Sequence, residues 1–525
     1  MKTTKHLLLV ALVLVMLLGV TVPLSVSAQS GSTDLVVINR EPATLDPHVG
    51  NDAGVWRVVV NVYEPLVGYK RGTSELEGVL AESWEISDDG LTYTFNLRDG
   101  VTFHDGTPFN AEAVKISLDR IHSINVGPAY ILNEYRETEV IDEMTVAIHL
   151  TNPVATFQAS LPRLFIVSPT AIAEHEVDGD QAQEWLRENT VGTGPYMLDH
   201  WTPGQEWQIV KYNDYWQGWP ENHLTSITML FVSEVSTARL MLEQGDVDMV
   251  GPYSPDDLPA FEANPDITVF TTPTALEFYI PMNTADGPLA DPLVREAVTL
   301  AFDYDAHVEA MGGLANRVNG PVPDSIPLHN DQLPLPEYDL DRASELLAEA
   351  GYPDGGFSLD YGYVNVLIEE QRAGEILQAG LAQLGIDLVI QPMTWPSLLS
   401  LIQAPADEAL DLYAYFVYPA YADPDAYLYS QFHSSQIGTG YNGMFVEDER
   451  LDELLEAGRV ATNPDERATI YAELQELLSE QHISLYVSNP TYVLPMRSWV
   501  KNFEYTPAFN ETYFFYGVYL EGKPS

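Results

Sequence analysis

The chain has 525 residues, of which 77 are acidic and 24 are basic, so its formal net charge at pH 7 is -53. This excess of carboxylates excludes nucleic acid as a partner, because the phosphate backbone would be repelled. The chain has no cysteine, which excludes disulfides, thiolate nucleophiles and a lipid anchor attached through a cysteine.

The first predicted element is a secretory signal peptide over residues 1–28. Lys2 and Lys5 precede an apolar run from Leu7 to Val20, and a stretch of small residues ends at Ala28. This is the order of segments in a cleaved leader. The run is shorter than the roughly 20 apolar residues that a membrane-spanning helix needs. We therefore expect an exported, acidic protein that is periplasmic or extracellular, soluble and without a lipid anchor.

Residues 80–97 predict a β-hairpin. Trp84 and Ile86 alternate with polar residues before the turn pair Asp89-Gly90, and apolar residues alternate again after it. Alternation on both sides of an Asp-Gly pair is typical of two antiparallel strands. The hairpin should lie at the edge of a sheet.

The second half of the chain alternates between helix and strand patterns. Asp291 and Pro292 have the cap and first-turn positions of a helix whose apolar stripe continues to Ala301. Further helices are predicted to close at Gly351 and at Gly385, the latter before the strand 386–392. A long helix from residue 464 should run into a strand that ends near Val487. This succession predicts α/β layering, and nearly 500 residues require at least two lobes.

Three strings in the first quarter of the chain carry a resemblance to a known family. They are EPATLDPH (41–48), YEPLVGY (63–69) and LAESWEISDDGLTYTFNLRDGVTFHDGTPFNAEAVKISLDRI (80–121). In this order they resemble the amino-terminal signature of family 5 extracellular solute-binding proteins. Further matching strings follow as far as ADPDAYLY (422–429), so the resemblance spans nearly the whole mature chain.

The resemblance implies a periplasmic-binding-protein-like fold of type II, with three domains and a ligand cleft. Domain I would be discontinuous, domain II inserted, and domain III a second lobe joined through two crossing segments, near Glu277 to Asn283 and Ser488 to Leu494. The implied boundaries are 34–62, 187–277 and 492–525 for domain I, 63–186 for domain II and 278–491 for domain III.

The same resemblance implies a function. Such proteins are the extracellular capture subunits of ABC importers: the lobes close over a ligand, which is then delivered to permease subunits in the membrane. We expect a peptide ligand, no cofactor, no bound metal and a monomeric protein. An oligosaccharide is the alternative, because some members of the family bind one.

Peptide-binding relatives suggest where the ligand backbone and its amino group would lie. Asn51 has the position that faces the bound backbone, although a turn residue capping its own loop explains it equally well. The aspartate that pairs with the ligand's amino group would stand at position 420, which is Ala420. We therefore expect Asp52, Asp423 or Asp425 to substitute, or else a ligand that lacks a free amine.

Aromatic residues crowd the segment 413–429 and the loop that leaves its strand. Tyrosine offers flat apolar area and a hydroxyl group, which suits peptide side chains and sugar rings alike. Loops at strand ends are where α/β proteins hold ligands. Tyr415, Tyr418 and Tyr421 are therefore candidate ligand contacts, together with Trp395, Tyr253, Tyr279 and Asn283.

A secreted glycoside hydrolase or peptidase is the remote alternative. The chain contains no HExxH, no phosphate-binding loop and no GxSxG motif. Paired carboxylates are unavoidable among so many acidic residues, so they do not identify a catalytic site. The sequence favours a binding protein that is not an enzyme.

Overall fold

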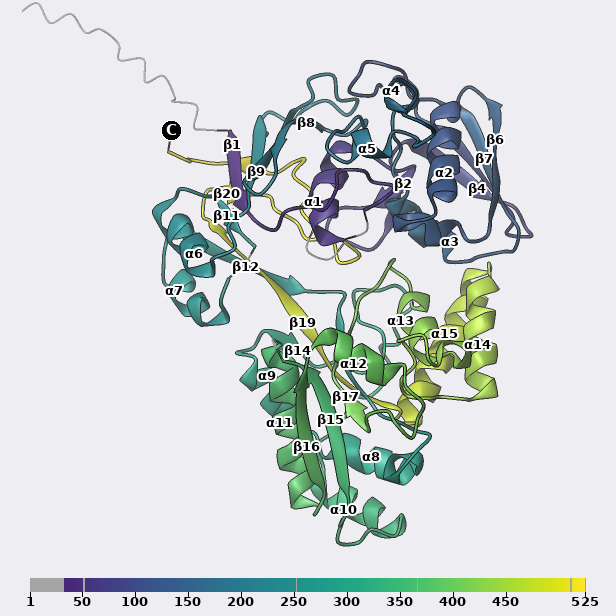
Figure 1. Cartoon of the computed structure of the whole chain (residues 1–525), viewed down its shortest axis with the longest axis vertical. Helices are drawn as coiled ribbons and strands as arrows, with labels where there is room; N and C mark the ends of the chain where they lie inside the picture. The colour runs from purple at the N-terminus through teal and green to yellow at the C-terminus, as the bar shows by residue number, and fades with distance from the viewer. Residues whose placement is uncertain (1–32, 51, 252, 366, 510–511, 525) are drawn as a thin grey trace, which may run out of the picture.

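The computed structural model describes residues 33–524 except 51, 252, 366, 510 and 511. Two lobes lie one above the other, and strands run between them (Figure 1). Helices and several sheets are packed together, which confirms the predicted α/β class. The predicted signal peptide lies outside the described residues. Within the described part of the chain, no helix is long and apolar enough to cross a membrane.

The first lobe is organised around a mixed sheet whose strands follow the order β11-β1-β10-β9-β8. Strand β1 pairs in parallel with both β10 and β11, and its Leu35 and Val37 are fully buried. Helix α1 contacts β8, and α6 contacts β11. The bounds are β1 Asp34–Ile38, α1 Ala53–Val62, β8 Tyr196–Thr202, β9 Glu206–Lys211, β10 Ser226–Leu230, α6 Val235–Gln244, β11 Met249–Val250, α7 Leu258–Glu262, β20 Val500–Lys501 and β21 Tyr519–Leu520.

An antiparallel sheet of order β4-β5-β7-β6 forms the unit inserted after α1. The predicted hairpin is confirmed: Ile86 pairs with Tyr93 across the turn, and β4 is the edge strand. Helix α2 packs against β6 and β7. The bounds are β2 Val67–Tyr69, β3 Leu76–Gly78, β4 Ala81–Ile86, β5 Thr92–Leu97, α2 Ala111–Ile124, β6 Tyr135–Asp142, β7 Thr145–Leu150, α3 Phe157–Ser160, α4 Pro169–His175 and α5 Gln183–Leu186.

The second lobe contains a parallel sheet of order β16-β15-β17. Helix α8 begins as predicted, because the Asp291 side chain accepts a hydrogen bond from the backbone N–H of Leu293 and Pro292 occupies the first turn. The bounds are α8 Pro292–Leu300, α9 Tyr304–Ala310, β14 Ala315–Asn316, α10 Leu340–Glu349, β15 Ser358–Val364, α11 Ile368–Gln383, β16 Asp387–Met393, α12 Trp395–Ile402, β17 Leu412–Tyr413, β18 Tyr415–Val417, α13 Asp425–Phe432, α14 Glu449–Val460 and α15 Pro464–Glu480.

Strand β19 (Ser484–Arg497) passes from one lobe to the other, and β12 (Ile267–Pro273) and β13 (Glu277–Pro281) pair with it. Figure 1 shows β19 running between the lobes. The prediction that this strand ends near Val487 is wrong. Pro490 lies where β19 changes partner from β13 to β12, and its carbonyl accepts a hydrogen bond from the N–H of Thr274. Proline has no N–H to donate to a neighbouring strand, and it is tolerated at this position because the strand changes partner there.

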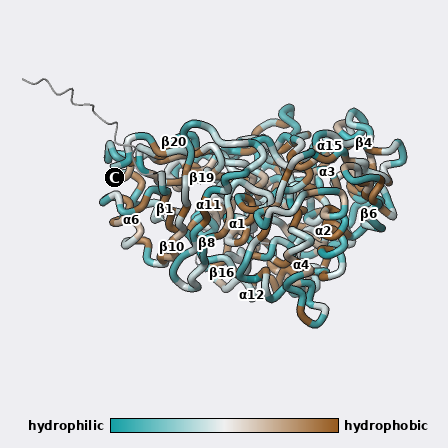
Figure 2. Tube along the Cα trace, turned by 90° about the horizontal axis from the view of Figure 1, so that it is seen from above, coloured by the Kyte–Doolittle hydropathy of each residue, from teal (hydrophilic) through white to brown (hydrophobic). Residues whose placement is uncertain are grey.

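Separate hydrophobic clusters fill the parts of the molecule. One lies wholly within residues 66–166 and another within 278–487. The largest joins α1 and the first-lobe sheet to residues 422–478, which the predicted boundaries assign to the second lobe. Seen from above, many hydrophobic stretches lie inside the outline of the molecule (Figure 2). The predicted domain boundaries stay a prediction.

Candidate functional site

The carboxyl ends of two adjacent parallel strands form one wall of the candidate site. Asn39 and Arg40 follow β1, and Gly251 and Tyr253 follow β11. These residues line a pocket of about 220 Å³ that also reaches the crossing strands at Thr274 and at 490–493. Open α/β sheets hold ligands at the carboxyl ends of their parallel strands. This pocket is therefore in the position where a ligand is expected.

Exposed or partly exposed residues follow two of the parallel strands of the second lobe. Helix α11 begins soon after β15 and brings Ile368 and Glu369, and Trp395 follows β16. The Ile368 and Trp395 side chains are 48% and 43% exposed. Burial, with a smaller contribution from the Glu369 carboxylate, raises the pKa of Tyr253 to about 12. The charge of Glu369 in the second lobe therefore acts on Tyr253 in the first.

Three of the predicted aromatic residues gather on the second lobe. The rings of Trp395 and Tyr415 are 6.1 Å apart, and Tyr418 follows on the same segment, 62% exposed. Burial raises the pKa of Tyr415 to about 12, and the neighbouring Tyr441 and Tyr418 add to the shift. These side chains offer an aromatic surface on which apolar groups or rings could stack.

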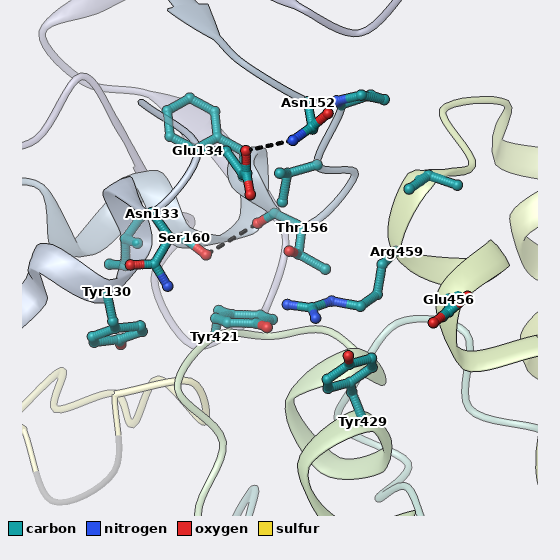
Figure 3. Close-up of a pocket in the computed structure, with 15 residues that line it drawn as sticks. Tyr130, Asn133, Glu134, Asn152, Thr156, Ser160, Tyr421, Tyr429, Glu456 and Arg459 are labelled. Atoms are coloured by element: carbon teal, nitrogen blue, oxygen red, sulfur yellow. Dashed lines mark hydrogen bonds between the residues drawn. The ribbon is translucent and has the colours of Figure 1, made fainter. Parts of the chain in front are cut away.

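A second pocket of about 520 Å³ lies between the inserted unit and the second lobe. In Figure 3 Tyr130 and Glu134 come from the inserted unit, whereas Tyr421, Tyr429 and Arg459 come from the second lobe. The Arg459 guanidinium lies 3.9 Å from the centre of the Tyr429 ring. Its charge also helps to lower the pKa of Glu134, although hydrogen bonds from Thr151 and Asn152 are the larger causes. The pocket is thus built from both sides of the gap between the lobes.

Hydrogen bonds join the two sides close to this pocket. The N–H of Ala155 donates to the carbonyl of Arg459 at 2.7 Å, and the N–H of Ala422 donates to the Tyr69 hydroxyl at 3.0 Å. The lobes therefore touch in the structure not only at the crossing strands but also beside the 520 Å³ pocket.

Internal partners hold the two predicted aspartates of the 423–425 segment. Both Asp423 oxygens accept hydrogen bonds from the Arg467 guanidinium at 2.7 Å, and both side chains are largely buried. Asp425 accepts a hydrogen bond from the Tyr421 hydroxyl at 2.6 Å and lies 3.4 Å from Arg459. Burial raises the pKa of Asp425 to about 6, against the opposing charge of Arg459.

The remaining predicted contacts are dispersed. Asp52 is exposed and caps α1, where it accepts hydrogen bonds from the N–H groups of Gly54 and Val55. Tyr279 is fully buried and donates to the carbonyl of Pro321. Asn283 is 2% exposed and donates to the carbonyl of Ala406 at 2.9 Å, while Asn51 lies outside the described residues. The structure thus brings together Trp395, Tyr415 and Tyr418, and separately Tyr421 with Asp423 and Asp425. Their contact with a ligand stays a prediction.

The sequence analysis missed Arg40, Glu369, Tyr130 and Arg459. The first two could have been found, because Arg40 closes the apolar run LVVINR and Glu369 follows the apolar segment YGYVNVLI. A polar residue at the end of a buried strand is a signal for a site in α/β proteins. Tyr130 and Arg459 belong to a pocket between units that are distant in sequence, and no local pattern indicates it.

Comparisons with known proteins agree with this architecture. The model of the family described as "Bacterial extracellular solute-binding proteins, family 5 Middle" matches residues 75–439. The chain belongs to this family. As a family 5 solute-binding protein, it has the periplasmic-binding-protein-like fold that its resemblance implied.

Similar proteins extend over almost the full chain of this family 5 protein. It is 28% identical over 490 residues to the "Probable D,D-dipeptide-binding periplasmic protein DdpA" of Escherichia coli (strain K12), covering 91% of this chain and 93% of that one. It is 32% identical over 478 residues to the "Glutathione-binding protein GsiB" of Shigella flexneri, covering 88% and 90%. The "ABC transporter-associated periplasmic binding protein DppA" of Helicobacter pylori, solved with the peptide STSA, is similar with a TM-score of 0.73 and 28% identity, covering 94% and 98%.

Proposed function

We propose that this protein captures a peptide between its lobes and delivers it to the membrane permease subunits of an ABC importer. The observation that carries the proposal is the convergence of parallel strand ends from both lobes. Asn39, Arg40 and Tyr253 follow strands of one lobe, Glu369 and Trp395 follow strands of the other, and the charge of Glu369 acts on Tyr253. Relatives named for binding dipeptides or glutathione, and one solved with a peptide, support a peptide as the ligand.

Strand β19 supports lobe closure as the means of capture. The lobes are joined through a few strand segments, and rotation about such segments closes two-lobed receptors over their ligands. A permease can then distinguish the loaded protein from the empty one by its shape. The hydrogen bond between Ala155 and Arg459, beside the 520 Å³ pocket, is a contact that opening of the lobes would break.

An oligosaccharide is the second candidate ligand. The half-exposed ring of Trp395 and the exposed ring of Tyr418 lie on the same side of the second lobe as Tyr415, and such surfaces stack on sugar rings as well as on peptide side chains.

The proposal also holds that the ligand is released unchanged and that the protein is exported without a lipid anchor. Its relatives are named as periplasmic binding proteins and not as enzymes. The acidic composition and the leader-like residues 1–28 agree with export.

Native mass spectrometry of the purified protein, followed by fragmentation of whatever it releases, tests this function. We expect an intact peptide with one copy per chain. An oligosaccharide would support the second candidate instead. Conversion of the released species on prolonged incubation with fresh protein would contradict a pure binding role.

A further inference from the structure

The carboxylates nearest to the aromatic surface are already engaged by the protein. Position 420 is an alanine, Asp423 is held by two hydrogen bonds from Arg467, and Asp425 is held by Tyr421 and Arg459. Moving Asp423 toward a ligand would leave the largely buried Arg467 without its partner, which is costly, and moving Asp425 would break its hydrogen bond from Tyr421. A positively charged group of a ligand therefore needs another acceptor.

Glu369 has the properties of such an acceptor. It follows β15 at the carboxyl edge of the second-lobe sheet, and its side chain is 18% exposed. Its Oε1 atom is buried and has no hydrogen-bond partner among the described residues. The adjacent Glu370 differs, since its Oε2 accepts a hydrogen bond from the N–H of Val364 at 2.7 Å. The Glu370 carboxylate is thus used within the fold, whereas Oε1 of Glu369 has no hydrogen-bond partner among the described residues.

No cation of the protein neutralises Glu369 in the described structure. The nearest basic group is His307 Nε2 at 3.8 Å, which also lies 3.2 Å from the Ser488 hydroxyl. Burial lowers the pKa of His307 to about 4, so this imidazole is neutral at pH 7. Burial also raises the pKa of Glu369 to about 7, because its charge is poorly solvated. A positive charge brought by a ligand would remove this penalty.

We propose that Glu369 is the residue that pairs with the ammonium group of the ligand, in place of the alanine at position 420. The inference rests on the peptide-binding function proposed above. The charge of Glu369 acts on Tyr253 of the first lobe, and the apolar residues Leu367 and Ile368, which precede Glu369 in the chain, are exposed. An ammonium group placed between Glu369 and Tyr253 therefore lies between the two lobes and favours their closure.

A pair of peptide libraries tests this assignment. Tripeptides made of alanine, serine, leucine and phenylalanine are prepared with a free amino end and, separately, N-acetylated, so the amino end is their only ammonium group. We expect the wild-type protein to bind the free-amine library at least about tenfold more tightly at pH 8, from the strength of a charged hydrogen bond. Glu369→Gln should bind both libraries with similar affinity, as followed by tryptophan fluorescence.

Glu375→Gln is the matched control, because it removes the same charge from an exposed position of the same helix. It should keep the wild-type preference. If wild-type protein binds both libraries alike, or if Glu369→Gln keeps the preference, the assignment of Glu369 is wrong while the peptide function stands. Binding of neither library by the wild-type protein would contradict the peptide function and this assignment together.

The pH dependence of binding gives a readout that a purely structural role would not produce. Below about pH 7 Glu369 of the empty protein becomes protonated, so affinity for the free-amine library should fall by up to about tenfold per pH unit. His307 stays neutral in this range, Tyr253 titrates near 12, and Glu370 also titrates near 7 but remains in the variant. Glu369→Gln should therefore lack most of this dependence, and an unchanged pH profile would argue against the assignment.

Discussion

Asp423 and Arg467 show how a charged pair near the candidate site serves the fold. The guanidinium donates two hydrogen bonds to the carboxylate, donates a third to the carbonyl of Gly458, and lies 4.7 Å from the centre of the Tyr471 ring. Both charged side chains are about nine-tenths buried. Removing one partner of such a pair lowers the stability of the fold, because the remaining charge stays buried without compensation.

Asp423→Asn should therefore destabilise the protein by about 3–5 kcal/mol, the range for a buried pair that loses one partner. Chemical denaturation followed by circular dichroism measures this difference. Arg450→Met, which breaks the exposed pair with Glu473, is the control and should cost less than about 1 kcal/mol. A small effect of Asp423→Asn on stability together with lost ligand binding would show instead that Asp423 is a ligand anchor.

How much of the site could be predicted from the sequence differs between residues. Tyr415 was identified from the crowding of tyrosines around a predicted strand and Trp395 as a further aromatic platform, and the structure places them side by side. Tyr279 was selected from its place on a crossing segment, but a sequence does not reveal that its hydroxyl reaches Pro321 inside the core. The arginine partners of Asp423 and Asp425 lie on helices α14 and α15, and local patterns carry no information about such tertiary pairs.

Strand β13 carries an unusual buried acid at the junction of the lobes. Glu277 is fully buried, and neither of its carboxylate oxygens has a hydrogen-bond partner in the described part of the chain. Burial, with a contribution from Asp324, raises the pKa of Glu277 well above its usual range. The folded state thus favours the protonated form, whereas the unfolded chain releases this proton near pH 4.5.

Stability should therefore fall as the pH rises from about 4.5 toward neutrality, because the folded protein holds a proton that the unfolded chain has lost. Glu277→Met removes this contribution. The variant should exceed the wild type in unfolding free energy by about 1–3 kcal/mol at pH 8, the range for an unpaired buried polar group, and by less at pH 5. Glu375→Met, at an exposed position of α11, is the control. A gain in unfolding free energy from Glu277→Met that is equal at both pH values would contradict the argument.

Elements with strong local signals were predicted well. The hairpin of β4 and β5 and the capped start of α8 follow from turn and cap residues, so their local sequence is sufficient. Strand β19 was predicted too short, because Ser488, Asn489 and Pro490 interrupt its apolar pattern. Its continuation depends on β12, β13 and β14, which supply the pairing from distant parts of the chain.

At the scale of the whole molecule, the contact between the lobes can be fixed experimentally. The chain contains no cysteine, so an introduced pair is unique. Ala155→Cys and Val460→Cys lie on opposite sides of the contact made by the Ala155 N–H and the Arg459 carbonyl. A short bifunctional thiol reagent should link them, and ligand should speed the reaction because closure brings the lobes together.

Linked protein loaded with ligand should release it at least about tenfold more slowly than the same variant without the reagent, since opening about the crossing strands is blocked. Each single cysteine variant treated with the reagent is the control for modification alone. Exchange of ligand at the same rate in linked and unlinked protein would show that release does not require the lobes to separate here.

The order of strands in the first-lobe sheet has a consequence for biogenesis. Strand β1 comes from the beginning of the described chain, and its neighbour β11 pairs on the other side with β19, which lies within the last 42 residues. A chain that is threaded across a membrane from its amino end therefore cannot complete this sheet until nearly all of it has emerged. During the export that we propose, β11 therefore lacks its neighbour β19 until residues 484–497 have emerged.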